Sequence, residues 1–142
     1  RHQIDYNNLL LYIKYKILSS NFIHIDSTIE YTKTLQPYDI PKLNQFLALN
    51  YYLQKKFDEA EKYYEINLKN NIDKSSTLYT LSSIYYMQNK KQKAFDYLSK
   101  AIENGFNYYW VLHNDVIWSS EMNNVKWQEI VKNIQPKPFP IQ

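Results

Sequence analysis

The fold is decided by residues 41–108, which read PKLNQFLALNYYLQKKFDEAEKYYEINLKNNIDK from 41 to 74 and SSTLYTLSSIYYMQNKKQKAFDYLSKAIENGFNY from 75 to 108. The two stretches align over 34 positions, with large residues on large ones and small residues on small ones. The matching pairs are Leu47 and Leu81, Ala48 and Ser82, Tyr51 and Tyr85, Ala60 and Ala94, Tyr64 and Leu98, and Leu68 and Ile102. A helical hairpin of this length cannot bury its apolar face alone, so neighbouring copies must stack into one core. The pattern predicts an all-α fold of stacked hairpins.

Residues 41–74, the first copy, are expected to form two helices. Pro41 suits the first turn of a helix, because its fixed φ and missing N–H are tolerated there, and this helix should run to about Gln54. The second helix has Asp58 near its start, where a carboxylate is favourable for the unpaired N–H groups, and should end near residues 70 and 71.

Residues 75–108, the second copy, repeat this arrangement. Ser75 or Ser76 is expected to cap a helix that runs to about Gln88. Asn89 provides the corner, because asparagine tolerates a left-handed backbone better than most residues, and the second helix should span residues 91–103.

Residues 1–40 read as a degenerate hairpin. Apolar side chains recur at helical spacing and predict a helix over residues 4–19, at Tyr6, Leu10, Ile13 and Ile17. Ser27 followed three residues later by Glu30 is a capping-box pattern, which predicts a second helix to about Gln36. Projecting the 34-residue frame backwards makes this hairpin a candidate first repeat.

Residues 109–135 are expected to close the array. Gly105 is the chain's single glycine and lies where a left-handed helix end is expected. Beyond it aromatic residues concentrate, and Asp115 and Asn124 are placed to cap two short helices. The tail, residues 136–142, is rich in proline and is expected to lie extended.

Composition excludes several classes of protein. The 142 residues suit one domain, assigned to residues 1–135, and the absence of cysteine removes disulfides and thiolate chemistry. The net charge of +3 comes from interspersed charges, which disfavours nucleic acid as a partner. No apolar run is long enough to span a membrane. We therefore expect a soluble protein. The chain starts with Arg1, so we expect that residues upstream have been removed, and the compartment stays open between cytoplasmic and exported after removal of an N-terminal segment.

The residues offer little for catalysis. A single glycine rules out a glycine-rich phosphate loop, and no serine-elbow motif occurs. His113 and Asp115 could suggest a metal site, but adjacent side chains diverge on a helix and the other histidines lie far away in sequence. Asp115 is better interpreted as a helix cap. We therefore expect no enzyme activity, no metal and no cofactor.

The repeated stretch resembles the tetratricopeptide repeat (TPR) family. The residues that carry the resemblance are Leu47, Ala48, Tyr51, Phe57, Ala60 and Tyr64 in the first copy, and Leu78, Leu81, Ser82, Tyr85, Ala94, Leu98 and Ala101 in the second. The segment that begins at Asn104, Gly105 and Phe106 is similar to the cap that closes some bacterial arrays of this family.

The resemblance implies a right-handed α-α superhelix whose concave face binds a protein or peptide. Family groove positions fall on Gln45, Leu49, Tyr52, Tyr79, Ser83, Tyr86, Trp110 and His113, and also on Leu11 and Tyr15 if residues 1–40 stack in frame. Family members that grip a chaperone's C-terminal carboxylate use Lys, Asn and Arg at such positions. Because this chain has Gln45, Leu49, Thr80, Trp110 and Asn114 there, we exclude that clamp.

Several tyrosines occur as adjacent pairs, and adjacent residues on a helix point about 100° apart. One tyrosine of each pair can therefore face the core while the other faces a groove or solvent. Periodicity assigns Tyr51 and Tyr85 to the core, each needing a partner for its hydroxyl. Tyr52, Tyr79 and Tyr86 form either a ligand-facing strip or ordinary amphipathic surface.

Two functions from different classes fit the sequence. The leading hypothesis is a non-catalytic adaptor that binds a protein or peptide in an aromatic groove. The alternative is a regulatory or scaffolding appendage of a larger, possibly enzymatic, chain. An RNA-binding helical repeat is a third hypothesis, disfavoured by the absence of a basic groove. The sequence does not define the oligomeric state.

Overall fold

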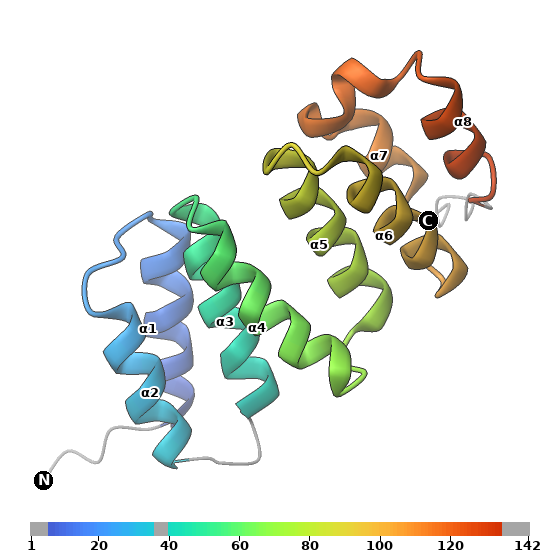
Figure 1. Cartoon of the computed structure of the whole chain (residues 1–142). Coiled ribbons are helices and arrows are strands. Elements are labelled where there is room, and N and C mark those ends of the chain that lie inside the picture. Colours follow the sequence, from blue (N-terminus) through green and yellow to red (C-terminus); the bar gives the residue numbers. More distant parts are fainter. Residues whose placement is uncertain (1–5, 36–39, 135–142) are drawn as a thin grey trace, which may run out of the picture. The chain divides into compact units, whose positions relative to one another are not determined.

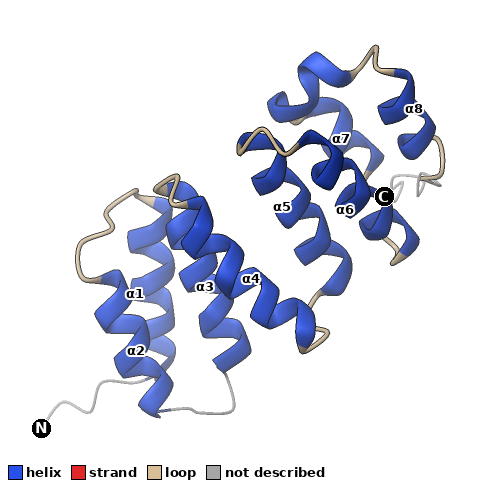
Figure 2. Cartoon of the chain, in the orientation of Figure 1, coloured by secondary structure: helices blue, strands red, loops and turns tan. Residues whose placement is uncertain are grey.

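The computed structural model describes residues 6–35 and 40–134, and every element among them is a helix (Figure 2). The chain divides into two compact units, Arg1–Ile72 and Asp73–Gln142 (Figure 1). The boundary lies close to the predicted junction of the two sequence copies. Each unit has its own core and is described separately.

The first unit contains two helical hairpins, α1 (Tyr6–Leu18) with α2 (Ile25–Leu35) and α3 (Ile40–Leu53) with α4 (Phe57–Lys69). Helix α3 packs on all three of the others, and α1 packs on α2. Six buried aliphatic side chains join α1, α2 and α3 into one cluster: Ile13, Ile17, Ile25, Ile29, Leu43 and Leu47. The N-terminal hairpin therefore shares a core with the first sequence copy.

The second unit contains one long hairpin, α5 (Lys74–Met87) with α6 (Lys91–Glu103), followed by three short elements. These are α7 (Tyr109–Asn114), the 3-10 helix η2 (Val116–Glu121) and α8 (Val125–Val131). Helix α8 packs on α6, whereas η2 packs on α5 and α7. The short elements bury large side chains in this unit's core, among them Phe106, Leu112, Trp118 and Trp127. They form a cap, residues 106–134, on the hairpin.

The two long hairpins turn and end with the same backbone geometry. Lys55 and Asn89, 34 positions apart, have φ values of 59° and 60°. Asn71 and Gly105, also 34 positions apart, have φ values of 54° and 98°. Each left-handed residue lets the following N–H reach back to a carbonyl of the last helical turn, the usual way to satisfy orphan carbonyls. These bonds are Lys56 to Tyr51 (2.9 Å), Lys90 to Tyr85 (2.8 Å), Ile72 to Asn67 (2.9 Å) and Phe106 to Ala101 (2.9 Å).

Small residues lie at the expected helix crossings. Ala60 in α4 and Ala94 in α6 are both completely buried, as their matched positions in the sequence predicted. A methyl side chain there lets the two helices of each hairpin approach closely. Asn89 and Gly105 also adopt the predicted left-handed backbone.

The predicted capping of α2 and α5 by serine is wrong. Helix α2 begins at Ile25, two residues before Ser27, and the Ser27 hydroxyl donates a hydrogen bond back to the carbonyl of His24 (3.0 Å). Helix α5 begins at Lys74, so Ser75 and Ser76 lie within its first turn, and its cap position is the left-handed Asp73. In both cases the preceding backbone starts the helix before the serine is reached.

The predicted caps of the two later helices are confirmed. A side-chain oxygen of Asp115 accepts from the N–H of Ile117 (3.2 Å), and that of Asn124 accepts from Lys126 (2.9 Å) and Trp127 (3.4 Å). The proline-rich tail and the loop around Pro37 lie outside the described residues. None of the described helices has the length and apolar character needed to cross a membrane.

Candidate functional site

The cap engages Tyr79, one of the predicted groove residues. Its ring stacks on Phe106, with centroids 4.3 Å apart and planes 9° apart. Its hydroxyl donates to Asp115 Oδ2 (2.6 Å) and accepts from Trp118 Nε1 (3.3 Å). Burial, and then the hydrogen bond to Asp115, raise the pKa of Tyr79 well above its ordinary value. Asp115 thus caps η2 and holds α5 at the same time.

Tyr86 lies seven positions after Tyr79 in α5 and also contacts the cap. Its ring packs on Trp118, with centroids 4.9 Å apart. Its hydroxyl lies 2.8 Å from Glu121 Oε1, to which it donates, and 2.8 Å from Ser120 Oγ. Burial is the largest cause of the raised pKa of Tyr86.

Glu121 is the polar centre of this contact and is only 5% exposed. Besides the Tyr86 hydroxyl, it accepts from Lys91 Nζ (2.8 Å) and from Asn124 Nδ2 (2.8 Å). Burial alone would raise the pKa of Glu121, but the hydrogen bonds from Lys91, Tyr86 and Asn124 outweigh it and lower the pKa below its ordinary value. The carboxylate is therefore held in its charged form and ties η2 to α5 and α6.

The second copy's predicted groove residues consequently lie against the chain's own cap. Ser83 is buried as well, and its hydroxyl donates to the Tyr79 carbonyl (3.2 Å). The structure brings Tyr79, Ser83 and Tyr86 together on one face of α5, as the repeat frame predicts, but η2 packs on that helix. The aromatic faces of both tyrosines are in contact with cap residues rather than lining an open groove.

The first copy's predicted residues lie in the other unit. Leu49 packs against the core cluster of α1, α2 and α3. Tyr52 is half-buried and meets Phe57 edge to face, with centroids 6.2 Å apart, and Gln45 is also half-buried. Leu49 and Tyr52 therefore each contribute part of their surface to the packing of this unit.

Helix α1 carries the most exposed apolar stripe of the described residues. Leu11, Tyr15 and Leu18 are 64%, 70% and 69% exposed, at a spacing of four and three residues. This spacing puts them on one face, opposite the face that buries Ile13 and Ile17. Leu11 and Tyr15 are the two positions that the backward projection of the repeat frame assigned to a groove.

The sequence did not predict the hydrogen bonds that join α2 to α3 through the Asp26 carboxylate. Asp26 accepts hydrogen bonds from Asn50 Nδ2 (2.7 Å) and from the Tyr51 hydroxyl (2.6 Å). Burial and this bond raise the pKa of Tyr51. Tyr85 is fully buried as predicted, whereas Tyr51 is half-buried and stacks on Tyr63, with centroids 5.8 Å apart. Asp26 lies 34 positions before Ala60, where the repeat pattern expects a small residue, and its carboxylate forms this link.

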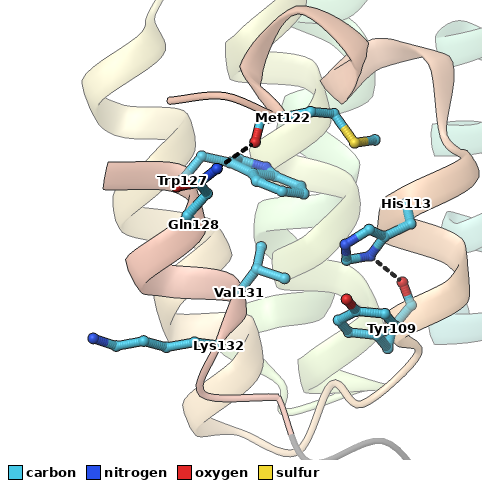
Figure 3. Close-up of a pocket in the computed structure, with 7 residues that line it drawn as sticks. All are labelled: Tyr109, His113, Met122, Trp127, Gln128, Val131 and Lys132. Carbon is cyan, nitrogen blue, oxygen red and sulfur yellow. Dashed lines mark hydrogen bonds between the residues drawn. The ribbon is translucent and has the colours of Figure 1, made fainter. Parts of the chain in front are cut away.

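A pocket of about 380 Å³ opens between α7 and α8 (Figure 3). Its walls are Tyr109, His113, Met122, Trp127, Gln128, Val131 and Lys132. His113 was a predicted site residue, whereas Trp110, the other one from this segment, is 55% exposed and does not line the pocket. The sequence signals for this pocket were the concentration of aromatic residues after Gly105 and the groove position assigned to His113.

Three aromatic rings shape the pocket. The Tyr109 and His113 rings stack with centroids 3.8 Å apart, and the His113 and Trp127 rings meet edge to face at 5.6 Å. His113 Nδ1 lies 3.0 Å from the Tyr109 carbonyl oxygen, so Nδ1 carries a proton. In the neutral ring, Nε2 is then a hydrogen-bond acceptor, and among the described residues it has no donor.

Trp127, in the pocket wall, is almost completely buried together with its indole N–H. Trp127 is 2% exposed, and its Nε1–H has no acceptor among the described residues. Gln128 Nε2 donates to the Met122 carbonyl (2.9 Å), and Lys132 extends away from the cavity (Figure 3). The pocket is therefore mainly apolar and aromatic, without a charged group pointing into it.

The predicted groove residues are thus distributed between an α5 face packed by η2, a partly buried α3 face, the exposed face of α1 and the cap, where His113 lines the pocket and Trp110 lies outside it. Within the described part of the chain, no group of three or more His, Asp or Glu side chains is arranged to hold a metal ion. Comparison of the chain with protein-family models, curated proteins and solved structures found no match.

Proposed function

We propose that the chain is a non-catalytic, TPR-like helical-repeat protein that binds a protein or peptide partner. The matched left-handed residues at Lys55 and Asn89, and at Asn71 and Gly105, support the interpretation of the two long hairpins as copies of one unit. The buried alanines at equivalent positions of α4 and α6 support it too. Stacked hairpins of this kind expose helix faces for binding.

The observation that carries the binding proposal is the apolar stripe of α1. Removing a large apolar side chain from water contributes roughly 1.5 to 3 kcal/mol. Single exposed apolar residues are ordinary, but Leu11, Tyr15 and Leu18 lie together on one helix face. Tyrosine within such a patch is typical of recognition surfaces, because it combines apolar area with a polar tip.

We assign the partner site to the first unit, with Leu11 and Tyr15 at its centre. Helix α3 packs on α1, and Leu49 reaches the core cluster that contains Ile13 and Ile17, on the face of α1 opposite the stripe. Leu49 and Tyr52 are therefore assigned to the packing of this unit. Tyr79 and Tyr86 are assigned to holding the cap.

The test is a triple variant, Leu11→Ser, Tyr15→Ser and Leu18→Ser, used as bait in an extract of the protein's native cells. Because the three side chains are exposed, helical circular dichroism and the melting temperature should stay the same. The partner that the wild-type chain retains should be lost from the triple variant, as quantified by mass spectrometry.

The matched control changes exposed polar residues on other helices of the same unit, Lys42→Ser in α3 and Lys69→Ser in α4, and should retain the partner. If the triple variant and the control retained the partner equally, the α1 face would not be the binding site. Loss of folding in the triple variant would show that the stripe is structural.

A further inference from the structure

We propose that the pocket between α7 and α8 is a second binding site, which takes an uncharged phenolic ring, as a small molecule or as a tyrosine side chain. The inference is independent of the α1 face, because the pocket lies wholly within the second unit. It follows from the size of the pocket, its walls and the position of His113 Nε2 as a hydrogen-bond acceptor.

The size and walls of the pocket favour a flat aromatic group. A cavity of about 380 Å³ is at the lower end of the range for small-ligand sites. Tyr109, His113 and Trp127 surround it with rings, and aromatic groups prefer partners in stacked or edge-to-face arrangements with centroids about 4.5 to 7 Å apart. Met122 and Val131 complete the walls, and a thioether adapts readily to the edge of a ring.

The charge of the pocket favours a neutral ligand. Lys132 lines the mouth with its aliphatic stem while its ammonium group extends away, and Gln128 is bound to the Met122 carbonyl (Figure 3). A charged ligand would lose its hydration without meeting an opposite charge, at a large cost in free energy.

One polar atom of the pocket favours a hydroxyl on the ring. His113 lines the cavity, and its Nε2 can accept a hydrogen bond. A phenol can donate that bond while its ring packs against the aromatic walls. Toluene has the same ring without the hydroxyl and is the natural comparison.

The experiment titrates the whole chain with p-cresol and with toluene, followed by NMR. Signals of the Trp127 indole N–H and of the Met122 and Val131 methyl groups report the pocket. The Trp110→Phe variant, altered at an exposed ring outside the pocket, assists assignment and serves as a binding control. We expect saturable shifts at the pocket signals with p-cresol, with a dissociation constant on the order of 1 mM, and ligand-to-methyl Overhauser contacts.

The variant His113→Phe tests the hydrogen bond, because it keeps an aromatic ring against Tyr109 and removes Nε2. It should weaken p-cresol binding about three- to tenfold and leave toluene binding unchanged. The melting temperature and the Trp indole spectrum verify that the cap remains folded.

N-acetyl-tyrosinamide distinguishes the two sources of the phenol. Saturable shifts of the same pocket signals identify a site for a tyrosine side chain, and binding of p-cresol alone identifies a small-molecule site. Either result supports a phenol pocket. The proposal would be overturned by chemical shifts that do not saturate or that map outside the pocket. It would also be overturned if His113→Phe weakened the binding of p-cresol and of toluene equally.

Discussion

At the scale of single residues, the hydroxyls of Tyr79 and Tyr86 are the most informative groups, because each donates to a carboxylate of the cap. Tyr79→Phe and Tyr86→Phe keep the rings and remove only these bonds. A hydrogen bond to a charged acceptor is worth roughly 1.5 to 3 kcal/mol, so each variant should lower the free energy of unfolding by about that amount. Urea denaturation followed by tryptophan fluorescence measures the loss.

Tyr108→Phe is the matched control, because Tyr108 is 50% exposed and lies in the same unit as the tryptophans. It should leave the unfolding curve unchanged. If Tyr79→Phe and Tyr86→Phe behaved like this control, the two tyrosines would return to being candidates for a ligand-facing strip.

Glu121 makes stability depend on pH. Its pKa in the folded protein is lower than the ordinary value of 4.5, so the folded state binds the proton less well than the unfolded state does. The stabilisation from this carboxylate is therefore present above about pH 4.5 and is lost as the pH falls through the folded-state pKa.

The variant Glu121→Gln isolates this contribution. At pH 7 it should be less stable than the wild type by roughly 1 to 3 kcal/mol, since it loses charged hydrogen bonds at a buried position. The difference should shrink between pH 5 and pH 3, as measured by urea denaturation at each pH. A constant difference across this range would show that the charge of Glu121 is not the stabilising feature.

At the scale of elements, the end of α6 rests on one left-handed residue. Gly105 has a φ of 98°, and an added Cβ would meet nothing within 4 Å. The cost of Gly105→Ala is therefore backbone strain alone, about 1 kcal/mol. Thermal unfolding should show this loss, whereas Glu103→Ala, at an exposed position in the last turn of the same helix, should change little.

The helix crossings make a second prediction at this scale. Ala60→Leu and Ala94→Leu should each overpack a fully buried contact and lower the free energy of unfolding by roughly 1 to 3 kcal/mol. Glu103→Leu adds a similar side chain at an exposed position of α6 and serves as the control. Unchanged melting of both alanine variants would contradict the close approach of the paired helices.

Helices and turns were largely predictable because their signals are local. The period of apolar residues located α1, α4 and α6, and the turn at Asn89 and the end at Gly105 needed only the backbone tolerance of those two residues. The serine caps failed for a different reason. His24 and Asp73 adopt positive φ values of 60° and 41° immediately before their helices. Asp and His adopt positive φ more often than most residues, but their presence alone does not predict it.

The candidate site was less predictable because it depends on contacts between distant residues. The repeat frame placed Tyr79 and Tyr86 on one helix face, as found, but their partners Asp115 and Glu121 lie about 35 positions away. Periodicity within a helix does not reveal which later segment packs on it. The pocket at His113 likewise needs α7 and α8 to converge, although the aromatic content of that segment was evident in the sequence.

At the scale of the whole molecule, the division into two compact units predicts two unfolding transitions. All three tryptophans, Trp110, Trp118 and Trp127, belong to the second unit, so their fluorescence reports that unit alone, whereas circular dichroism reports helices in both. Ala60→Leu should shift the circular dichroism curve and leave the fluorescence transition in place. Ala94→Leu should shift both. Coincident curves in every variant would instead indicate a single cooperative unit.

The pairing of α5 hydroxyls with cap carboxylates restricts how such a chain could grow by duplication. A hairpin inserted before residue 109 would have to present donors to Asp115 and Glu121 in place of Tyr79 and Tyr86. A copy of residues 75–108 carries both phenols and could stand last. A copy of residues 41–74 would bring Gln45 and Tyr52 to those positions, leaving Asp115 without its phenol. A longer chain of this kind could therefore bind the same cap only when its last hairpin keeps this pair of tyrosines.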